Sequence, residues 1–306
     1  MTNGEKMKQK LREFCRSIGI DAVGIAPAGP YKELEVMLRN RRELGLYTEL
    51  EEQDLAKRID PHCTLPGVQS VIVCLFPYYT GDIAGANLPR YAYGRDYHNL
   101  VRKKLEQIGA FLTDRIPGFI YQAFVDTGPL ADRYLAYLAG LGFYGLNSHI
   151  ITDRYGSYVV IGYLLNNYPF SPDQPQERVC RQCGRCIRAC PGQVILGNYR
   201  IDPRGCRSYL TQKKGELTEE ERRILQRTNL LFGCDVCQEV CPHNQEIELT
   251  SLPEFRQDLF GCLNGGELDR FSNREFKEKY GDRAFSWRGK GILLRNWRYL
   301  KAGQDV

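Results

Sequence analysis

A chain of 306 residues that is 42% hydrophobic and 26% charged can bury the core of one large domain or two ordinary ones. Its net charge of +5 suits a phosphate-bearing partner and an ordinary solvated surface equally, so charge alone identifies no nucleic acid. The charged N-terminus lacks the apolar segment of a secretory signal, and the longest apolar stretch, near Tyr158–Leu165, is too short to cross a bilayer. We therefore expect a cytoplasmic protein with no membrane partner, whose 12 cysteines serve as metal ligands more readily than as disulfides.

Helical and strand-like patterns alternate over the first 170 residues. Helical spacing predicts helices over Lys8–Ile18, Tyr31–Arg42, Tyr97–Leu112 and Leu130–Leu138. Short apolar runs predict strands over Ala22–Ala26, Ser70–Leu75, Phe119–Val125 and Tyr158–Leu165. Such alternation predicts an α/β layer in which helices cover a sheet.

The composition changes at Asn166–Glu177, a stretch rich in proline and polar residues that is typical of a linker. Eight of the 12 cysteines follow between Cys180 and Cys241, and the chain beyond them has weak helical character. These changes predict an α/β domain over 1–170, a cysteine-rich domain over 171–250 and a C-terminal helical extension over 251–306.

The cysteines form two related motifs. The first, Cys180-x2-Cys183-x2-Cys186-x3-Cys190-Pro, is the run that bacterial ferredoxins use to bind a four-iron cluster. Its first three thiolates bind one cluster, and its fourth thiolate is a ligand of the other cluster. The second motif, Cys234-x2-Cys237-x3-Cys241-Pro, lacks a first cysteine, and Cys206 is the one unassigned cysteine between the motifs.

This crossing predicts two [4Fe-4S] clusters and assigns all eight cysteines. Cluster one takes Cys180, Cys183, Cys186 and Cys241, and cluster two takes Cys190, Cys206, Cys234 and Cys237. The alternative is a pair of four-cysteine zinc sites, which two runs ending in x3-Cys-Pro fit poorly. We expect the four isolated cysteines to be small buried hydrophobic residues: Cys15, Cys63, Cys74 and Cys262.

Asp126 is the first charged residue after a predicted strand. A carboxylate at the end of a strand is a candidate general acid if burial raises its pKa. Equally, Asp126 can cap the helix that begins near Pro129, and from the residues alone the cap is the stronger interpretation.

Six stretches, in order over nearly the whole chain, together resemble the epoxyqueuosine reductases, cobalamin- and iron–sulfur-dependent enzymes that complete queuosine in tRNA. They are RIDP at Arg58–Pro61, RYAYGRDYH at Arg90–His98, VDTGPLADRYLAYLAGLGFYGLNSHIITDRYGSYVVIG at Val125–Gly162, CRSYLTQKKG at Cys206–Gly215, FGCDVCQEVCPHN at Phe232–Asn244 and WRGKGILLRN at Trp287–Asn296. The resemblance implies a nitroreductase-like, cobalamin-binding first domain followed by the two-cluster ferredoxin-like domain.

The resemblance also implies roles for single residues. Asp126 corresponds to the proton donor, which favours the acid over the cap, and such an acid is most useful when it is neutral near pH 7. Lys214 corresponds to a position that approaches tRNA. The residues that match corrinoid-lining stretches are Arg58, Asn147, Ser148, Ile150, Ser157, Ser208 and Asp235. For these the ordinary structural roles are turn or cap formation, surface charge and, for Ile150, core packing.

The resemblance implies that electrons pass from the clusters to cobalamin and then to the epoxide, with an external low-potential donor such as flavodoxin or ferredoxin. The chain departs from the family at Leu146, where lysine is usual, and it stops about ten residues after Arg295–Asn296, where many members begin a helical-repeat module that grips tRNA. Two alternatives follow: a corrinoid-dependent reductase of a small molecule, and a ferredoxin-like electron carrier for a partner protein.

Overall fold

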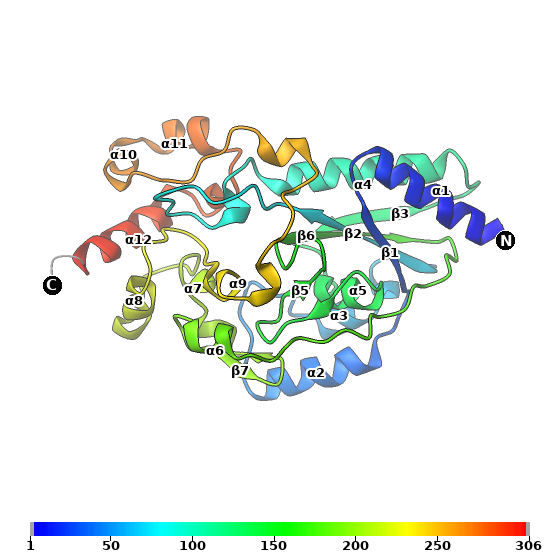
Figure 1. Ribbon diagram of the computed structural model, residues 1–306, viewed down its shortest axis with the longest axis horizontal. Coiled ribbons are helices and arrows are strands. Elements are labelled where there is room, and N and C mark those ends of the chain that lie inside the picture. Colours follow the sequence, from blue (N-terminus) through cyan, green and yellow to red (C-terminus); the bar gives the residue numbers. More distant parts are fainter. Residues whose placement is uncertain (1–2, 304–306) are drawn as a thin grey trace.

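The computed structural model describes residues 3–303. At its centre lies a four-stranded antiparallel sheet in the order β1-β2-β6-β3 (Figure 1). The strands of this sheet are β1 (Ala22–Pro27), β2 (Ser70–Pro77), β6 (Val159–Asn166) and β3 (Tyr121–Val125). Two small antiparallel pairs accompany it, β4 (Phe143–Tyr144) with β5 (Ile150–Ile151) and β7 (Ile195–Gly197) with β8 (Arg200–Ile201).

Twelve α-helices lie within the described residues. Those of the first half are α1 (Asn3–Ser17), α2 (Lys32–Glu43), α3 (Leu55–Ile59), α4 (Tyr97–Thr113) and α5 (Asp132–Leu138). Those of the second half are α6 (Arg185–Ala189), α7 (Arg207–Leu210), α8 (Glu219–Gln226), α9 (Val236–Glu239), α10 (Gly265–Arg270), α11 (Asn273–Tyr280) and α12 (Lys290–Ala302).

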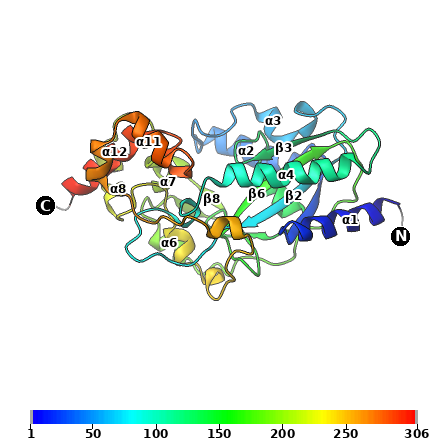
Figure 2. The ribbon, with the colours of Figure 1, turned by 90° about the horizontal axis from the view of Figure 1, so that it is seen from above.

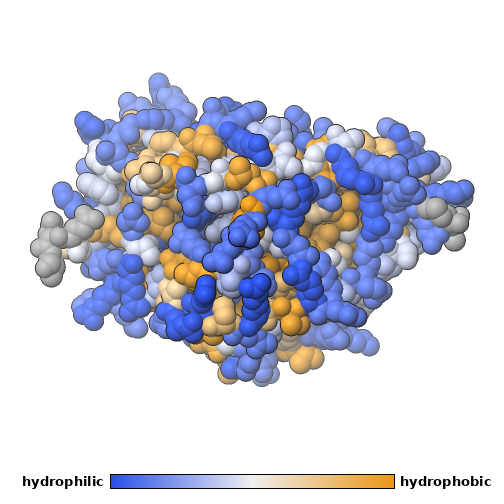
Figure 3. Space-filling view, viewed as in Figure 1, coloured by the Kyte–Doolittle hydropathy of each residue, from blue (hydrophilic) through white to orange (hydrophobic). Residues whose placement is uncertain are grey.

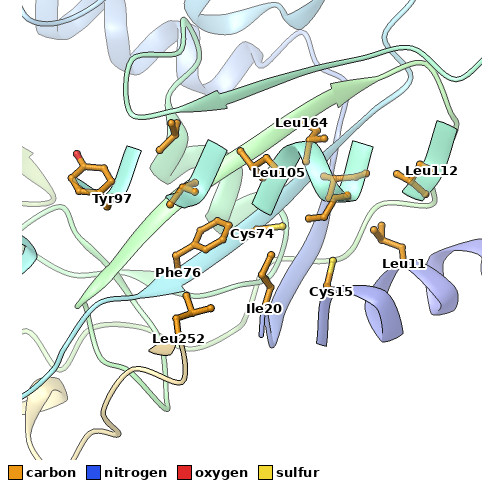
Figure 4. Packing of buried hydrophobic residues seen from close by; sticks show 14 of the residues in the cluster. Leu11, Cys15, Ile20, Cys74, Phe76, Tyr97, Leu105, Leu112, Leu164 and Leu252 are labelled. Atoms are coloured by element: carbon orange, nitrogen blue, oxygen red, sulfur yellow. The ribbon is translucent and has the colours of Figure 1, made fainter. Parts of the chain in front are cut away.

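Helices cover both faces of the central sheet. In Figures 1 and 2, α1 and α4 lie on one side of the strands and α2, α3 and α5 on the other. Along β2, Cys74 and Phe76 pack toward α1 and α4 (Figure 4), as does Ile72. Val71 and Val73 pack toward α2 and α5. Because successive side chains of a strand point to opposite faces, a strand buried on both faces is apolar throughout.

The predicted elements of the first domain are confirmed, with shifts of a few residues at their ends. All neighbouring strands of the sheet are antiparallel, so the fold is α+β. The stretch predicted as a linker has no regular structure, yet it is fastened to the sheet: Asp173 accepts from the Ile25 backbone N–H at 2.8 Å and pairs with Lys8 and Arg12.

The helical character predicted beyond Cys241 is present as α10, α11 and α12. These helices form a separate apolar cluster with the segment that contains Leu88 and Tyr93 and with Leu231 and Phe232. The C-terminal helices therefore pack against both the first domain and the cysteine-rich segment. None of the helices within residues 3–303 has the length and apolarity that a membrane span requires.

The expectation for the isolated cysteines is half wrong. Cys15 and Cys74 are fully buried side by side between α1 and β2 (Figure 4), as predicted. Cys63 and Cys262 are exposed. Each lies in a short turn or an irregular segment instead of on the apolar face of a helix or strand, so no layer covers it.

Candidate electron-transfer and catalytic site

The structure gathers the four cysteines assigned to cluster one around a single cavity. Cys180, Cys183, Cys186 and Cys241 line one hollow that is partly open to solvent. Cys186 and Cys241 are buried, whereas Cys183 is the only exposed cysteine of the eight. The cavity is closed from the other side by the loop that contains Gly145 to Asn147.

The cysteines assigned to cluster two also meet one another. Burial raises the pKa of the Cys237 thiol, and its neighbours Cys234, Cys206 and Cys190 raise it further. Cys206 comes from the start of α7, far from either motif in the sequence. Across residues 3–303, no three His, Cys, Asp or Glu side chains converge closely enough for a single metal ion. Cysteine runs that end in x3-Cys-Pro suit a cubane better than one zinc ion.

A buried arginine lies directly beside cluster two. Arg207 follows Cys206 in the chain, and its side chain is among the largest that are fully buried. Its guanidinium donates to the backbone carbonyls of Leu225, Thr228, Leu230 and Gly233. Within residues 3–303 it contacts no carboxylate, and the charged groups that act on it are Cys234 and Cys206. A buried cation without a carboxylate partner is costly unless another negative charge is near it.

Asp126 lies at the end of β3, where the backbone turns sharply. Its φ of 56° lies in the left-handed region, which aspartate tolerates better than most residues. The Thr127 N–H donates to the Val125 carbonyl at 2.6 Å, which fixes this turn. The helix that follows begins at Asp132 with Ala131 as its N-cap. Asp126 therefore does not cap that helix, and the capping interpretation is wrong.

The turn directs the Asp126 carboxylate to the N-terminus of α4. Its Oδ2 accepts a hydrogen bond from the Tyr97 hydroxyl at 2.8 Å and lies 3.3 Å from Nε2 of His98. On its other side, Nδ1 of His98 lies 2.7 Å from Oδ1 of Asp96, which also caps α4. The Tyr97 and His98 rings stack at 4.2 Å between centroids. The imidazole thus lies between two carboxylates.

These contacts decide where the proton is held. Burial opposes a charged imidazole, but Asp126 and Asp96 prevail and raise the pKa of His98 to about 9. Burial would likewise raise the pKa of Asp126, yet the hydrogen bonds from His98 and Tyr97 lower it below its ordinary value. These contacts favour a carboxylate at Asp126 and a proton on His98, which is the reverse of the neutral Asp126 expected from the sequence.

An aromatic series connects this pair with cluster two. Tyr91 lies edge-on to Tyr97, with centroids 6.2 Å apart, and 6.2 Å from the Phe232 ring. Phe232 precedes the cluster-two ligand Cys234 by two residues. Burial raises the pKa of Tyr91, and Asp235, Asp126 and Cys234 contribute, so Tyr91 is close to both groups. Cluster two is therefore the cluster nearer to Asp126.

Three of the predicted corrinoid residues lie together next to cluster two. Asn147 is buried and donates to the Cys237 carbonyl at 3.2 Å. Ser157 is buried and accepts from Nε2 of Gln238. Asp235 is buried and accepts from the Arg90 backbone N–H at 2.6 Å, while burial, offset in part by Arg90, raises its pKa to about 6.

The other predicted residues lie further out. Ser148 has a left-handed backbone next to Tyr199, and the Ile150 side chain is in the core, which leaves only its backbone for a ligand. Arg58 pairs with Glu51. The carbonyl of Ser208 accepts two hydrogen bonds within its own turn, from Thr211 and Gln212. Lys214 is exposed in the loop that Arg295 holds through the Lys213 and Gly215 carbonyls.

Two of the predicted corrinoid residues each have a buried atom without a hydrogen-bond partner. Oδ1 of Asp235 and Nε of Arg58 are buried and have no hydrogen-bond partner within the described structure. Buried polar atoms are nearly always paired, so an orphaned pair among the predicted corrinoid residues fits a large ligand rich in amide groups, as cobalamin is. The four-cysteine groups likewise fit two cubane clusters. The residues present therefore fit both kinds of cofactor.

The other histidines are poor candidates for a cobalt ligand. Burial, with the nearby Arg133, lowers the pKa of His149 to about 3, and its Nδ1 faces the Asn147 carbonyl at 3.1 Å. His243 lines the cluster-one cavity and receives the Arg181 backbone N–H at 3.5 Å.

Sequence reasoning missed the roles of Tyr97, Asp96 and Arg207. The first two lie in the RYAYGRDYH stretch, whose Asp-x-His pattern marks a capped helix start. No spacing rule shows that this helix start meets Asp126, because the contact spans 28 residues and depends on the sheet. For Arg207 the signal is a charged residue directly after an assigned ligand.

The fold and the site together define an iron–sulfur reductase, with a double-cluster domain joined to an α+β domain that holds a carboxylate–imidazole pair. Residues 179–244 match the family model described as 4Fe-4S double cluster binding domain, and residues 58–127 match Epoxyqueuosine reductase QueG, DUF1730. Epoxyqueuosine reductases from Bacillus cereus and Bacillus subtilis are 38% and 36% identical, over 95% and 96% of this chain and 79% and 78% of theirs. The chain belongs to the epoxyqueuosine reductase family.

Solved structures agree. An epoxyqueuosine reductase with an epoxyqueuosine-modified tRNA-Tyr stem loop is 35% identical, with a TM-score of 0.92 over 98% of this chain and 82% of that one. The epoxyqueuosine reductase from Bacillus subtilis, with its catalytic aspartate loop swung out of the active site, has a TM-score of 0.91 and 34% identity. This match covers 98% of this chain and 82% of that one. A reductive dehalogenase, at 16% identity and a TM-score of 0.52 over 83% of this chain and 34% of that one, shares the fold alone.

Proposed function

We propose that this protein is an epoxyqueuosine reductase that converts the epoxide of epoxyqueuosine in tRNA to queuosine, using two [4Fe-4S] clusters and cobalamin. The observation that carries the proposal is the connection, through Tyr91, between the Asp126–His98 pair and cluster two, in a chain of this family. Electron supply and proton supply thus meet at one place. An electron carrier without its own reaction needs no such proton-holding pair.

Loss of the epoxide oxygen as water consumes two electrons and two protons and leaves a carbon–carbon double bond. Bound cobalamin supplies the low-potential, carbon-reactive electron chemistry that amino-acid side chains lack. Asn147, Ser157 and Asp235, which contact or precede α9 beside Cys237, would hold it together with Arg58.

The chain's own residues supply the proton. His98 holds it at neutral pH, and Asp126 lies 3.3 Å away with its other hydrogen bond from Tyr97. An alkoxide is far more basic than either group, so transfer from the pair to the epoxide oxygen is favourable. The pair is open to an incoming substrate, because the Asp126 side chain remains 58% exposed.

The remaining assignments follow from this function. We assign corrinoid binding and catalysis to residues 1–170, the clusters to 171–250 and a supporting role to 251–306, with Lys214 near the tRNA. The electron donor is an external low-potential carrier such as flavodoxin or ferredoxin. Because the substrate is tRNA, we place the protein in the cytoplasm, without a membrane partner.

The test is turnover with purified components. Anaerobically reconstituted protein with cobalamin, dithionite and epoxyqueuosine-containing tRNA should form queuosine, detected by mass spectrometry of the nucleosides. Asp126→Asn should keep iron content and cobalamin but lose most turnover, by about 10²–10⁴-fold. Absence of queuosine with both cofactors confirmed present would refute the function, and full activity of Asp126→Asn would refute the acid role.

A further inference from the structure

A basic surface surrounds the outer side of cluster one. Residues 178–201 contain five arginines and no aspartate or glutamate. Arg178 pairs with Asp153, whereas the other four are exposed and have no carboxylate partner within residues 3–303: Arg181, Arg185, Arg188 and Arg200. An ordinary solvated surface mixes both signs of charge, so unpaired cations of one sign over this length call for a negative partner.

Three of these arginines lie beside the exposed ligand. Arg181 and Arg185 line the cavity that contains Cys183, and Arg188 donates to the Cys183 carbonyl at 3.2 Å. Three apolar side chains of the same segment are also exposed, Val179 at 68%, Leu196 at 47% and Tyr199 at 41%. Figure 3 shows hydrophilic and hydrophobic side chains interleaved over the lower part of the molecule, where α6 and β7 lie in Figure 1. Cations around an apolar centre are typical of a protein-docking surface.

Asn147 lines the cluster-one cavity and donates to the Cys237 carbonyl, so this surface adjoins the predicted corrinoid residues, but Asp126 lies on the side of cluster two. Cluster two, through Tyr91 and Phe232, is the cluster that adjoins Asp126. Cluster one takes the ligand that reaches solvent, Cys183. An electron that enters at Cys183 therefore passes cluster one and then cluster two before it reaches the catalytic domain.

Building on the proposed reductase function, we propose that Arg181, Arg185, Arg188 and Arg200 form the docking surface for a small acidic protein that carries single electrons. At each encounter the reduced carrier loses one electron and cluster one gains it. Two encounters supply the two electrons that one epoxide consumes. Weak, electrostatically steered contacts of this kind suit a carrier that must leave after each transfer.

An RNA is the other polyanion that could use these arginines. The geometry favours the protein, because the modified base must reach Asp126 on the side of cluster two. A bound RNA would also gain nothing from the exposed cluster ligand, whereas an electron donor requires it. RNA binding at this surface is kept as an outcome of the test.

The experiment measures reduction of the clusters by reduced flavodoxin, an acidic one-electron carrier, in stopped-flow absorbance without substrate. The variant is Arg181→Glu/Arg185→Glu. The control is Arg16→Glu/Arg270→Glu, which changes net charge equally at exposed arginines on α1 and α10, away from the clusters. Dithionite, which is small and needs no docking surface, measures whether the clusters themselves still accept electrons.

We expect the second-order rate with flavodoxin at low salt to fall at least about tenfold in the variant, and its salt dependence to weaken. The control and all rates with dithionite should be unchanged. An unchanged flavodoxin rate in the variant overturns the proposal, as does a loss of tRNA affinity with the flavodoxin rate intact. If the charge reversals reduce iron content, Arg181→Gln/Arg185→Gln gives the same comparison. Because the assay omits tRNA, its result is separate from that of the turnover test.

Discussion

His98 should be the source of the proton that Asp126 delivers, and its replacement tests this directly. The perturbation is His98→Gln, which keeps a polar side chain at α4 but removes the positive charge. The imidazole lies between Oδ1 of Asp96 and Oδ2 of Asp126, at 2.7 and 3.3 Å. Without it, Asp126 loses the hydrogen bond that contributes most to lowering its pKa.

The pH dependence of the rate follows from the pKa of His98, which is about 9. At pH 8 roughly ten protonated imidazoles are present for each neutral one, and at pH 10 the ratio is inverted. Single-turnover rates of the parent protein should therefore be flat up to about pH 8 and fall about tenfold per pH unit above 9. Since the raised pKa stabilises the folded state below the ordinary value of 6.5, that contribution is lost as pH rises through 9.

The assay is a single turnover of pre-reduced enzyme with modified tRNA across this pH range, so that electron delivery does not limit the rate. His98→Gln should be slower by about 10²–10⁴-fold at pH 7 and should lack the fall near pH 9. Because the two residues act as a unit, His98→Gln/Asp126→Asn should be little slower than Asp126→Asn alone.

The chain offers a matched control for this variant. Nδ1 of His62 lies 2.8 Å from Oδ1 of Asp60, in the same Asp-x-His pattern at a capped helix start, but away from Asp126. His62→Gln should therefore behave as the parent protein. A His98→Gln variant that keeps a parental rate and its fall near pH 9 would refute the reasoning.

Three further variants test other parts of the structure. Arg207→Gln should lower the reduction potential of cluster two by at least about 59 mV, a tenfold change in the one-electron equilibrium, because the cluster loses its buried cation. An anaerobic EPR titration measures this potential, and an unchanged value would contradict the prediction. Cys206→Ser should remove cluster two and about half of the iron while cluster one stays detectable; loss of cluster one alone would overturn the assignment. Gly156→Ala should lower the thermal midpoint more than Gly85→Ala: both glycines have positive φ, but a Cβ at 156 would lie 2.0 Å from Oδ1 of Asn244, and one at 85 in open space. Equal losses of thermal midpoint in the two variants would show that the structure relieves the clash at residue 156.

How much the sequence predicts depends on whether the information is local. The cysteine groups are predicted well because ligand spacing within a turn is a local constraint, and Cys206 follows by elimination. The strands of the first domain are predicted for the same reason, since burial on both faces makes β2 apolar throughout.

The failures concern contacts between distant segments. The pKa of Asp126 depends on His98 and Tyr97, which only the folded sheet and α4 bring to it. A position at the end of a strand suggests only burial, and burial raises the pKa of Asp126 instead of lowering it. The predicted burial of Cys63 and Cys262 is wrong because the exposure of a turn depends on which other segments cover it. The composition of the chain does not show this.

The crossed cysteine groups also constrain how the protein matures. Cluster one needs Cys241 and cluster two needs Cys234 and Cys237, so neither set of ligands is complete until synthesis has passed these residues. By then the whole central sheet, which ends at Asn166, has been made and can fold. We expect iron to be inserted as a late step, on a domain that already has its shape.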